Sequence, residues 1–429
     1  MLSIFRTISA LLSAVVLFGL ANGLFFTLLG IRMSADGVST GMIGLVGSAY
    51  FAGMLVGTLI CERIIRRVGH IRAFTVFGAV LAVAALLHPL IPEIWVWILL
   101  RFAMGFAMAG YFMIAESWLQ FESTTETRGR TFAFYILAHT VGLGLGPLVV
   151  ILADPAGYEL FAVASILYSI ALLPVALTAL SNPELGESSR FGIRDLYALS
   201  PVAVVGAFAV GLTVGAFSSL GPVYGQRIGL STTAISLLMM APRLGGFLSQ
   251  YPAGMMSDRY DRRRVMFVLT LATVLVSMIF GVASAAPVAL ILILAGLYGG
   301  ASQPVYSLVV AHANDHVEPD NFVAAIAGLL FAHGVGASIG PTAAAGAMAW
   351  FGPAGLFLFI AAVLACFAGF IVHRMARREG VPADQKDSFV PATRNAPATS
   401  LLDPRAPWEK RLDPERQKME RMLDESRWR

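Results

Sequence analysis

A ten-residue pattern occurs twice in this chain of 429 residues, once in each half. The pattern Ala-His-x-Val-Gly-x-x-x-Gly-Pro covers 138–147 and returns 194 positions later, at 332–341. Other pairs keep nearly the same spacing, since Gly53 matches Gly245 and Arg67 matches Arg259, both 192 positions apart. A register held over this length indicates a duplicated chain that folds as two similar halves.

The composition places the chain in a membrane. Hydrophobic residues make up 57% of it and charged residues 13%, against roughly 25% charged in an average soluble domain. Twelve apolar stretches each approach the roughly 20 residues that a helix needs to cross a bilayer. Their approximate spans are 8–31, 42–61, 71–90, 94–116, 131–152, 159–180, 201–224, 233–256, 265–285, 287–311, 322–346 and 353–372.

The fold prediction follows from the duplication and the spans together. We expect an all-α integral membrane protein whose twelve transmembrane helices form two pseudo-symmetric six-helix bundles, 1–180 and 201–372. The longest polar interruption, 181–200, is the predicted cytoplasmic linker. The charged segment 373–429 is a predicted cytoplasmic tail that is partly disordered, because its composition cannot bury a core.

The distribution of basic residues predicts the orientation. With both termini in the cytoplasm, 26 of the 30 Lys and Arg residues lie in cytoplasmic segments, which is the usual bias of short loops. We therefore expect a multi-pass protein of the inner (plasma) membrane. The same bias accounts for the net charge of +4, so nucleic acid is not an expected partner.

Other chemistry is not indicated by the sequence. Cys61 and Cys366 are the only cysteines, and no phosphate-binding Gly-x-x-x-x-Gly-Lys pattern occurs. His312 and His316 have a spacing that could share a metal ion, but no further ligands accompany them. We expect no enzyme activity, no cofactor and no metal site.

The segment 254–264 carries the first family resemblance. Gly254 precedes Asp258 and Arg259 by one helical turn, and more arginines, including Arg263, follow. This arrangement resembles the loop signature of the major facilitator superfamily, whose transporters alternate between inward-open and outward-open states. The first-half counterpart, 62–72, keeps Gly69 and Arg72 but has Arg66 where the second copy has Asp258. Both loops are gating candidates. In the first-half loop Glu62 could supply the missing acid, and the alternative there is a basic turn that only sets orientation.

The duplicated pattern resembles the antiporter-associated motif of the superfamily's fifth helix. Small residues four apart allow close helix approach, and the proline bends the segment, which makes both copies gating candidates. These candidates are Gly142, Gly146, Pro147, Gly336, Gly340 and Pro341.

A second resemblance narrows the family. Glu116, followed by Arg128 and Arg130, is similar to the pattern around the inner loop of the YcaD-like subgroup. The resemblance implies a latch between Glu116 and one of these arginines. An ordinary interfacial charge pair of little energetic value is the alternative.

Three ionisable residues within the spans are proton-coupling candidates: Arg101, His139 and His333. A histidine can shuttle protons near neutral pH, although neutral imidazoles that serve helix packing are the more favoured interpretation of this pair. The sequence around Arg101 resembles the superfamily's fourth-helix motif, which implies proton coupling or cavity lining. An arginine that snorkels to the interface is the alternative.

The superfamily resemblance also implies which helices line a central cavity, namely the first, fourth, seventh and tenth. Polar groups at depth and their aromatic or Met neighbours are then substrate-cavity candidates. They are Asn22, Phe26, Arg101, Met108, Tyr111, Ser218, Arg243, Gln303 and Tyr306.

The leading hypothesis is a monomeric secondary active transporter that moves a small organic or amphipathic solute across the bilayer by alternating access. Proton-coupled efflux, as in an antiporter, is the first choice. Uptake by a symporter or facilitator, and a transporter-derived membrane sensor whose tail binds a partner, are the alternatives.

Overall fold

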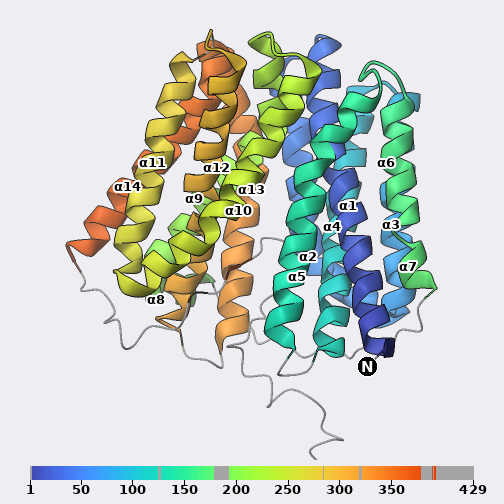
Figure 1. Cartoon of the computed structure of the whole chain (residues 1–429), viewed down its shortest axis with the longest axis horizontal. Coiled ribbons are helices and arrows are strands. Elements are labelled where there is room, and N and C mark those ends of the chain that lie inside the picture. The colour runs from blue at the N-terminus through green and yellow to red at the C-terminus, as the bar shows by residue number, and fades with distance from the viewer. Residues whose placement is uncertain are drawn as a thin grey trace, which may run out of the picture.

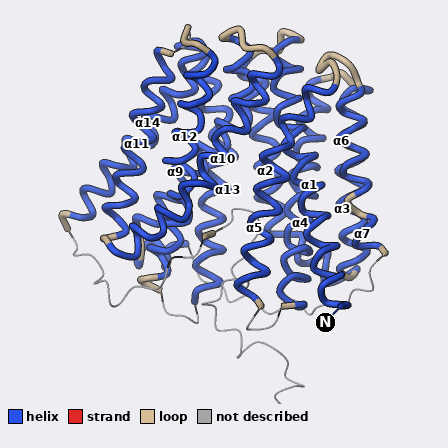
Figure 2. Tube along the Cα trace, viewed as in Figure 1, coloured by secondary structure: helices blue, strands red, loops and turns tan. Residues whose placement is uncertain are grey.

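Every element in the described part of the chain is a helix, and short loops join the helices at the two ends of the molecule (Figure 1 and Figure 2). The computed structural model describes residues 2–123, 127–177, 193–283, 285–317, 321–377, 389 and 391–392. Helices satisfy all of their interior backbone N–H and C=O groups within one segment, as the water-free core of a bilayer requires.

The helices form twelve rods, six in each half of the described chain. The first half contains α1 (Leu2–Ala35), α2 (Thr40–Val68), α3 (His70–Leu90), α4 (Ile94–Glu122), α5 (Arg128–Leu145) with the 3-10 helix η1 (Gly146–Leu152), and α6 (Glu159–Ile170) with α7 (Leu173–Ala176). The second half contains the short α8 (Ile193–Leu199), then α9 (Pro201–Arg227), α10 (Thr232–Arg259), α11 (Arg262–Val282), α12 (Val288–Asn314), α13 (Phe322–Phe351), η3 (Gly352–Ala354) and α14 (Gly355–Met375).

The predicted spans coincide with these rods, except that 178–180 and 284 lie outside the described residues. Ten described stretches are long and apolar enough to cross a membrane; one of them, Ala324–Met375, contains both α13 and α14, and α10 is not among the ten. The outward surface is apolar, since the side chains of Trp350, Leu177 and Val282 are 86%, 86% and 83% exposed. Such exposure suits a lipid environment rather than water.

The same helix pairs pack in both halves. α2 packs on α4 as α10 packs on α12, α1 on α5 as α9 on α13, and α3 beside α6 as α11 beside α14. The halves meet along two further pairs, α2 with α13 and α10 with α5 and η1, and α1 contacts α9 between them. Duplication in the sequence therefore appears as repeated packing in space.

The glycines of the duplicated pattern lie in the closest of these contacts. A Cβ on Gly142 would overlap the carbonyl oxygen of Val16 in α1. In the second half, a Cβ on Gly336 would overlap the carbonyl of Phe208, and one on Gly340 that of Leu212, both in α9. Helices lack a hydrophobic driving force for association inside lipid, so such backbone-to-backbone packing is what holds them together.

The proline that follows the glycines acts differently in the two copies. α5 ends at Leu145, and the segment from Gly146 with Pro147 continues as the 3-10 helix η1. α13 instead remains α-helical through Pro341 to Phe351. The proline therefore interrupts the α-helix in the fifth rod, whereas the eleventh rod is one continuous α-helix.

The two halves are held together at the upper end of the molecule in Figure 1, opposite the N-terminus. The Ser48 and Thr342 hydroxyls hydrogen-bond at 2.8 Å between α2 and α13, and Arg227 donates to Thr40 at 2.6 Å. Nearby, Gly30 packs against Pro222 without room for a side chain. We call this set of contacts the upper seal.

Gly340 tests the role of the glycine contacts. Gly340→Ala should lower stability by about 1–3 kcal/mol, because the added methyl group overlaps the α9 backbone. Gly346→Ala on the same helix is the matched control, since nothing lies within 4 Å of its Cβ position. The measurement is the temperature at which purified protein in detergent loses half of its monodisperse fraction. Equal temperatures for the two variants would contradict this packing role.

Candidate functional site

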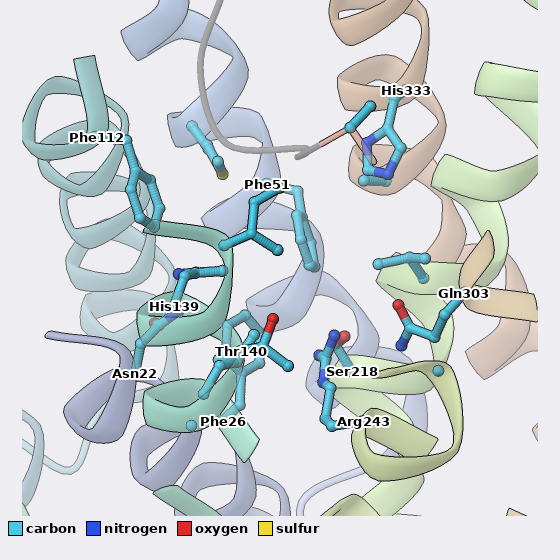
Figure 3. A pocket seen from close by; sticks show the side chains of 18 of the residues that line it. Asn22, Phe26, Phe51, Phe112, His139, Thr140, Ser218, Arg243, Gln303 and His333 are labelled. Carbon is cyan, nitrogen blue, oxygen red and sulfur yellow. The ribbon is translucent and has the colours of Figure 1, made fainter. Parts of the chain in front are cut away.

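A central cavity lies between the two halves, below the upper seal (Figure 3). Its volume is about 250 Å³. Both halves supply its walls, through α1, α2, α4, α5 and η1 on one side and α9, α10, α12 and α13 on the other. The cavity is therefore placed where the duplication predicts a substrate site.

Seven of the predicted cavity and proton-coupling residues line this cavity, as does Pro147 of the gating candidates. Figure 3 shows several of them pointing into it from opposite walls. They are Asn22, Phe26, His139, Ser218, Arg243, Gln303 and His333.

Four other predicted cavity residues lie behind the walls, which corrects their placement. Arg101, Met108, Tyr111 and Tyr306 are at most 1% exposed and do not line the cavity. The cause in the first half is the tight packing of α2 on α4, where Gly105 meets the Tyr50 carbonyl so closely that a Cβ could not fit. α2 thus covers α4, which contributes only Phe112 to the lining.

α2 provides an aromatic wall, through Tyr50 and Phe51, that is not among the sequence predictions. The Phe26 and Tyr50 rings meet edge to face at 4.8 Å, and Phe51 lies 5.4 Å from Tyr50. The Tyr50 hydroxyl donates to the Asn22 side-chain oxygen at 3.2 Å, which orients both groups at the cavity surface. The repeat gives a signal that could have found Phe51, because it occupies the position equivalent to Arg243, 192 residues earlier.

Arg101 supports this wall from behind. Its guanidinium carbon lies 4.2 Å from the Tyr50 ring centroid and 4.5 Å from that of Phe26, both within cation–π range. The side chain is 1% exposed, so it does not snorkel to an interface. Its Nε and Nη1 atoms have no hydrogen-bond partner among the described residues.

The two predicted histidines occupy equivalent places in the two walls. The His139 ring meets Phe112 at 5.2 Å and 78°, and the His333 ring meets Tyr306 at 5.2 Å and 79°. Phe112 and Tyr306 are themselves 194 positions apart, the spacing that separates the histidines. Each half therefore presents an imidazole, held edge to face by an aromatic ring, to the same cavity.

Arg243 is the one Lys or Arg in the cavity lining, and the described lining contains no Asp or Glu. Its stem packs on α5, 3.5 Å from the Cβ position of Gly144. None of the described ion pairs includes it. The cavity therefore has a positive electrostatic character.

At the lower end, the loop motif of the second half centres on Arg262 rather than on Arg263. Arg262 donates from Nε to Asp315 Oδ2 at 2.6 Å and from Nη2 to Asp315 Oδ1 at 3.2 Å, with both side chains 1% exposed. Asp258 lies 3.5 Å from the same guanidinium, and Ser257 accepts from it at 2.9 Å. Asp315 is not among the predicted residues, because it follows α12, far from the motif along the chain.

The remaining motif residues form local contacts. Arg263 pairs with Asp261 at 2.8 Å. Partial burial acts to raise the pKa of the Asp261 carboxyl, but hydrogen bonds from Arg263 hold it below its usual value. Gly69, at φ +87°, ends α2 in a conformation that glycine adopts easily. Arg72 and Arg259 are exposed.

The predicted latch residue Glu116 is fully buried. It accepts a 2.5 Å hydrogen bond from the Tyr135 hydroxyl of α5. Arg130 is exposed at the start of α5, and the side chain of Arg128 lies outside the described part of the structure. The pairing of Glu116 with either arginine stays a prediction.

Three residues of the predicted tail contact the lower end of the cavity. The Phe389 backbone N–H donates to Asp258 at 3.0 Å, and the Ala392 N–H donates to Ser307 at 3.1 Å. Pro391 and Ala392 are part of the cavity lining. The rest of the tail beyond residue 377 lies outside the described residues.

Metal binding finds no structural basis in the described residues, where no three His, Cys, Asp or Glu side chains are grouped to hold an ion. His316 instead uses its Nδ1 in a 2.8 Å hydrogen bond with the His312 carbonyl.

Twelve helical rods in the described part of the chain, in two similar halves around a central cavity, are typical of a membrane transporter built by duplication. The chain belongs to the Major Facilitator Superfamily, whose family profile matches residues 11–246 and 203–414. It is 30% identical over 364 residues to the uncharacterized MFS-type transporter YcaD of Escherichia coli O6:K15:H31, covering 83% of this chain and 93% of that protein.

Solved transporter structures share the fold at low sequence identity. The nucleoside transporter NupG aligns with a TM-score of 0.74 and 14% identity, over 88% of this chain and 100% of that one. The D-xylose–proton symporter aligns with a TM-score of 0.67 and 13% identity, over 90% and 99%.

The buried ion pair gives a stability prediction. Asp315→Asn should cost about 3–5 kcal/mol, because it leaves the Arg262 guanidinium buried without its carboxylate. Asp36→Asn is the control, since Asp36 pairs with Arg32 while 44% exposed, where a pair contributes about 0–1 kcal/mol. Thermal inactivation of the two purified variants compares them. A loss for Asp36→Asn as large as that for Asp315→Asn would contradict the importance of burial.

Proposed function

We propose that this protein is a secondary active transporter that exports a small amphipathic organic solute in exchange for protons. The observation that carries the proposal is the cavity between the halves, which is sealed at the upper end and lined by aromatic, polar and ionisable side chains. A site at the junction of two repeats can be exposed to either side by rocking one half against the other.

The packing supports alternating access in particular. The halves touch along α2 with α13 and along α10 with α5 and η1, two contacts that the duplication makes equivalent. In the structure the hydrogen bonds of the upper seal join α2 to α13 and α9 to α2. The opposite state would break this seal and bring together the loops at Gly69 and at 260–261.

The predicted orientation indicates which side of the membrane the seal and the cavity opening face. With the termini in the cytoplasm, the upper seal faces outward and the cavity takes up solute from the cytoplasmic side. Export then requires the seal to open with solute bound. The resemblance of the Gly142 to Pro147 segment to an antiporter motif supports exchange.

His139 and His333 are the proposed proton carriers. Both line the cavity, and both belong to helices that contact the opposite half. Imidazole gains and loses a proton near neutral pH, so the solute-free carrier can return with a proton in place of solute. Arg101, behind the aromatic wall, is proposed to set the electrostatic field rather than to carry the proton.

The test is pH change inside sealed vesicles that contain purified protein, challenged with a panel of single-ring solutes. Wild type should move protons only when a transported solute is present. His139→Ala/His333→Ala should lower this proton movement to the rate of protein-free vesicles, because both carriers are removed. His373→Ala, on the exposed end of α14, is the matched control and should behave like wild type.

Two results would contradict the proposal in different ways. Solute flux without proton movement in wild type would refute proton exchange and leave transport intact. Absence of flux for every solute in the panel would refute transport itself.

A further inference from the structure

The two walls of the cavity carry different chemistry at equivalent positions of the repeat. Phe51 in the first half corresponds to Arg243 in the second, and Phe26 corresponds to Ser218, each 192 positions apart. All four line the cavity. Four of the five Phe and Tyr rings in the lining belong to the first half, whereas Arg243 belongs to the second. Polar groups line both walls, but most of the aromatic rings lie on the first-half wall and the arginine lies on the second-half wall (Figure 3). We call these the aromatic wall and the cationic wall.

The cationic wall lacks a counter-charge. Arg243 forms none of the described ion pairs, and the described lining offers no carboxylate. A guanidinium at membrane depth is costly unless it meets an anion or water in a cavity. Its planar donors match a carboxylate in a bidentate geometry, so a solute carboxylate is the natural complement.

A neighbouring side chain adds hydrogen-bonding capacity to this wall. The Gln303 stem packs over Gly246, one helical turn beyond Arg243 on α10, so close that a Cβ on Gly246 would overlap it. Ser218 faces the same cavity from α9. The amide N–H groups of Gln303 and the hydroxyl of Ser218 can donate further hydrogen bonds to the oxygens of a carboxylate held by the guanidinium.

The aromatic wall disfavours a cationic solute. Arg101 already occupies one face of the Tyr50 and Phe26 rings, at 4.2 and 4.5 Å. A second cation at these rings would face the Arg101 charge behind them and the Arg243 charge opposite. With two guanidiniums nearby and no carboxylate among the described lining residues, the site favours a ring that carries a negative group.

The volume limits the solute to a small molecule. About 250 Å³ lies just below the roughly 300–1,000 Å³ of typical small-molecule pockets. This space suits one ring with a short substituent.

We propose that the cavity binds a single-ring aromatic carboxylate, with its ring against Phe26, Tyr50 and Phe51 and its carboxylate on Arg243. Transport of this solute rests on the proposed function, whereas its binding to the cavity does not. Export of such an anion would carry negative charge outward, so an inside-negative membrane potential would assist it.

Binding to the purified full chain in detergent tests the site directly. Four probes each contain a single six-membered ring and differ in charge or aromaticity: benzoate, benzamide, benzylammonium and cyclohexanecarboxylate. Benzoate should bind about tenfold or more tightly than benzamide, because the charged group adds hydrogen bonds to Arg243. It should also bind more tightly than cyclohexanecarboxylate, since only a planar ring stacks on the wall. Benzylammonium should bind most weakly.

Substitutions assign the preference to the two walls. Arg243→Gln should remove the preference for benzoate over benzamide, Arg243→Lys should retain part of it, and the exposed Arg377→Gln should leave it unchanged. Phe51→Ala should remove the preference for benzoate over cyclohexanecarboxylate. The control for that variant is Phe134→Ala, whose side chain is 50% exposed on the outer face of α5.

The outcomes separate the substrate class from the transport function. Benzamide or benzylammonium binding as tightly as benzoate, or an unchanged preference in Arg243→Gln, would overturn the carboxylate proposal even if vesicles transport other solutes. Benzoate binding that depends on Arg243 would support the site even if no probe crossed the vesicle membrane, a result that would overturn only the proposed transport.

Discussion

The close approach of helix backbones at glycine is the interaction on which the rest of this structure depends. Inside lipid, apolar side chains gain little by leaving their surroundings, so association relies on packing that only small residues permit. Gly142 against α1 and Gly336 and Gly340 against α9 fix the two inner helix pairs. His139 and His333 belong to these two helix pairs, and the cavity lies between the pairs. One motif, copied by duplication, therefore builds each half and positions its ionisable group.

The two copies of the repeat have diverged in the side chains that they place around the cavity. Phe51 and Arg243 occupy equivalent positions of the repeat and place an aromatic ring on one side of the cavity and a guanidinium on the other. The lower end diverged in the same way. Arg262 is buried against Asp315 in the second half, while Arg66 pairs with Glu62 on the exposed surface in the first. The ion pair of the second-half loop is therefore the more deeply buried of the two.

The sequence predicted the architecture well because its signals are local or repeated. Apolar runs define the rods, and the constant register between copies defines the halves. The cavity lining was predicted in part, since polar residues at depth such as Asn22, Arg243 and Gln303 have few alternatives in lipid. Tyr50 was missed because the face of α2 that it occupies depends on how Gly105 meets that helix. Asp315 was missed because its partner lies 53 positions away, across a contact that exists only after folding.

The upper seal offers the most direct test of alternating access. Ser48→Cys/Thr342→Cys, in a Cys366→Ser background that removes the exposed native thiol, places two thiols where hydroxyls now lie 2.8 Å apart. We predict that oxidation links α2 to α13 and stops solute and proton flux, that reductant restores it, and that each single cysteine has no such effect. Full flux through the cross-linked protein would show that the seal need not open, and would contradict the account.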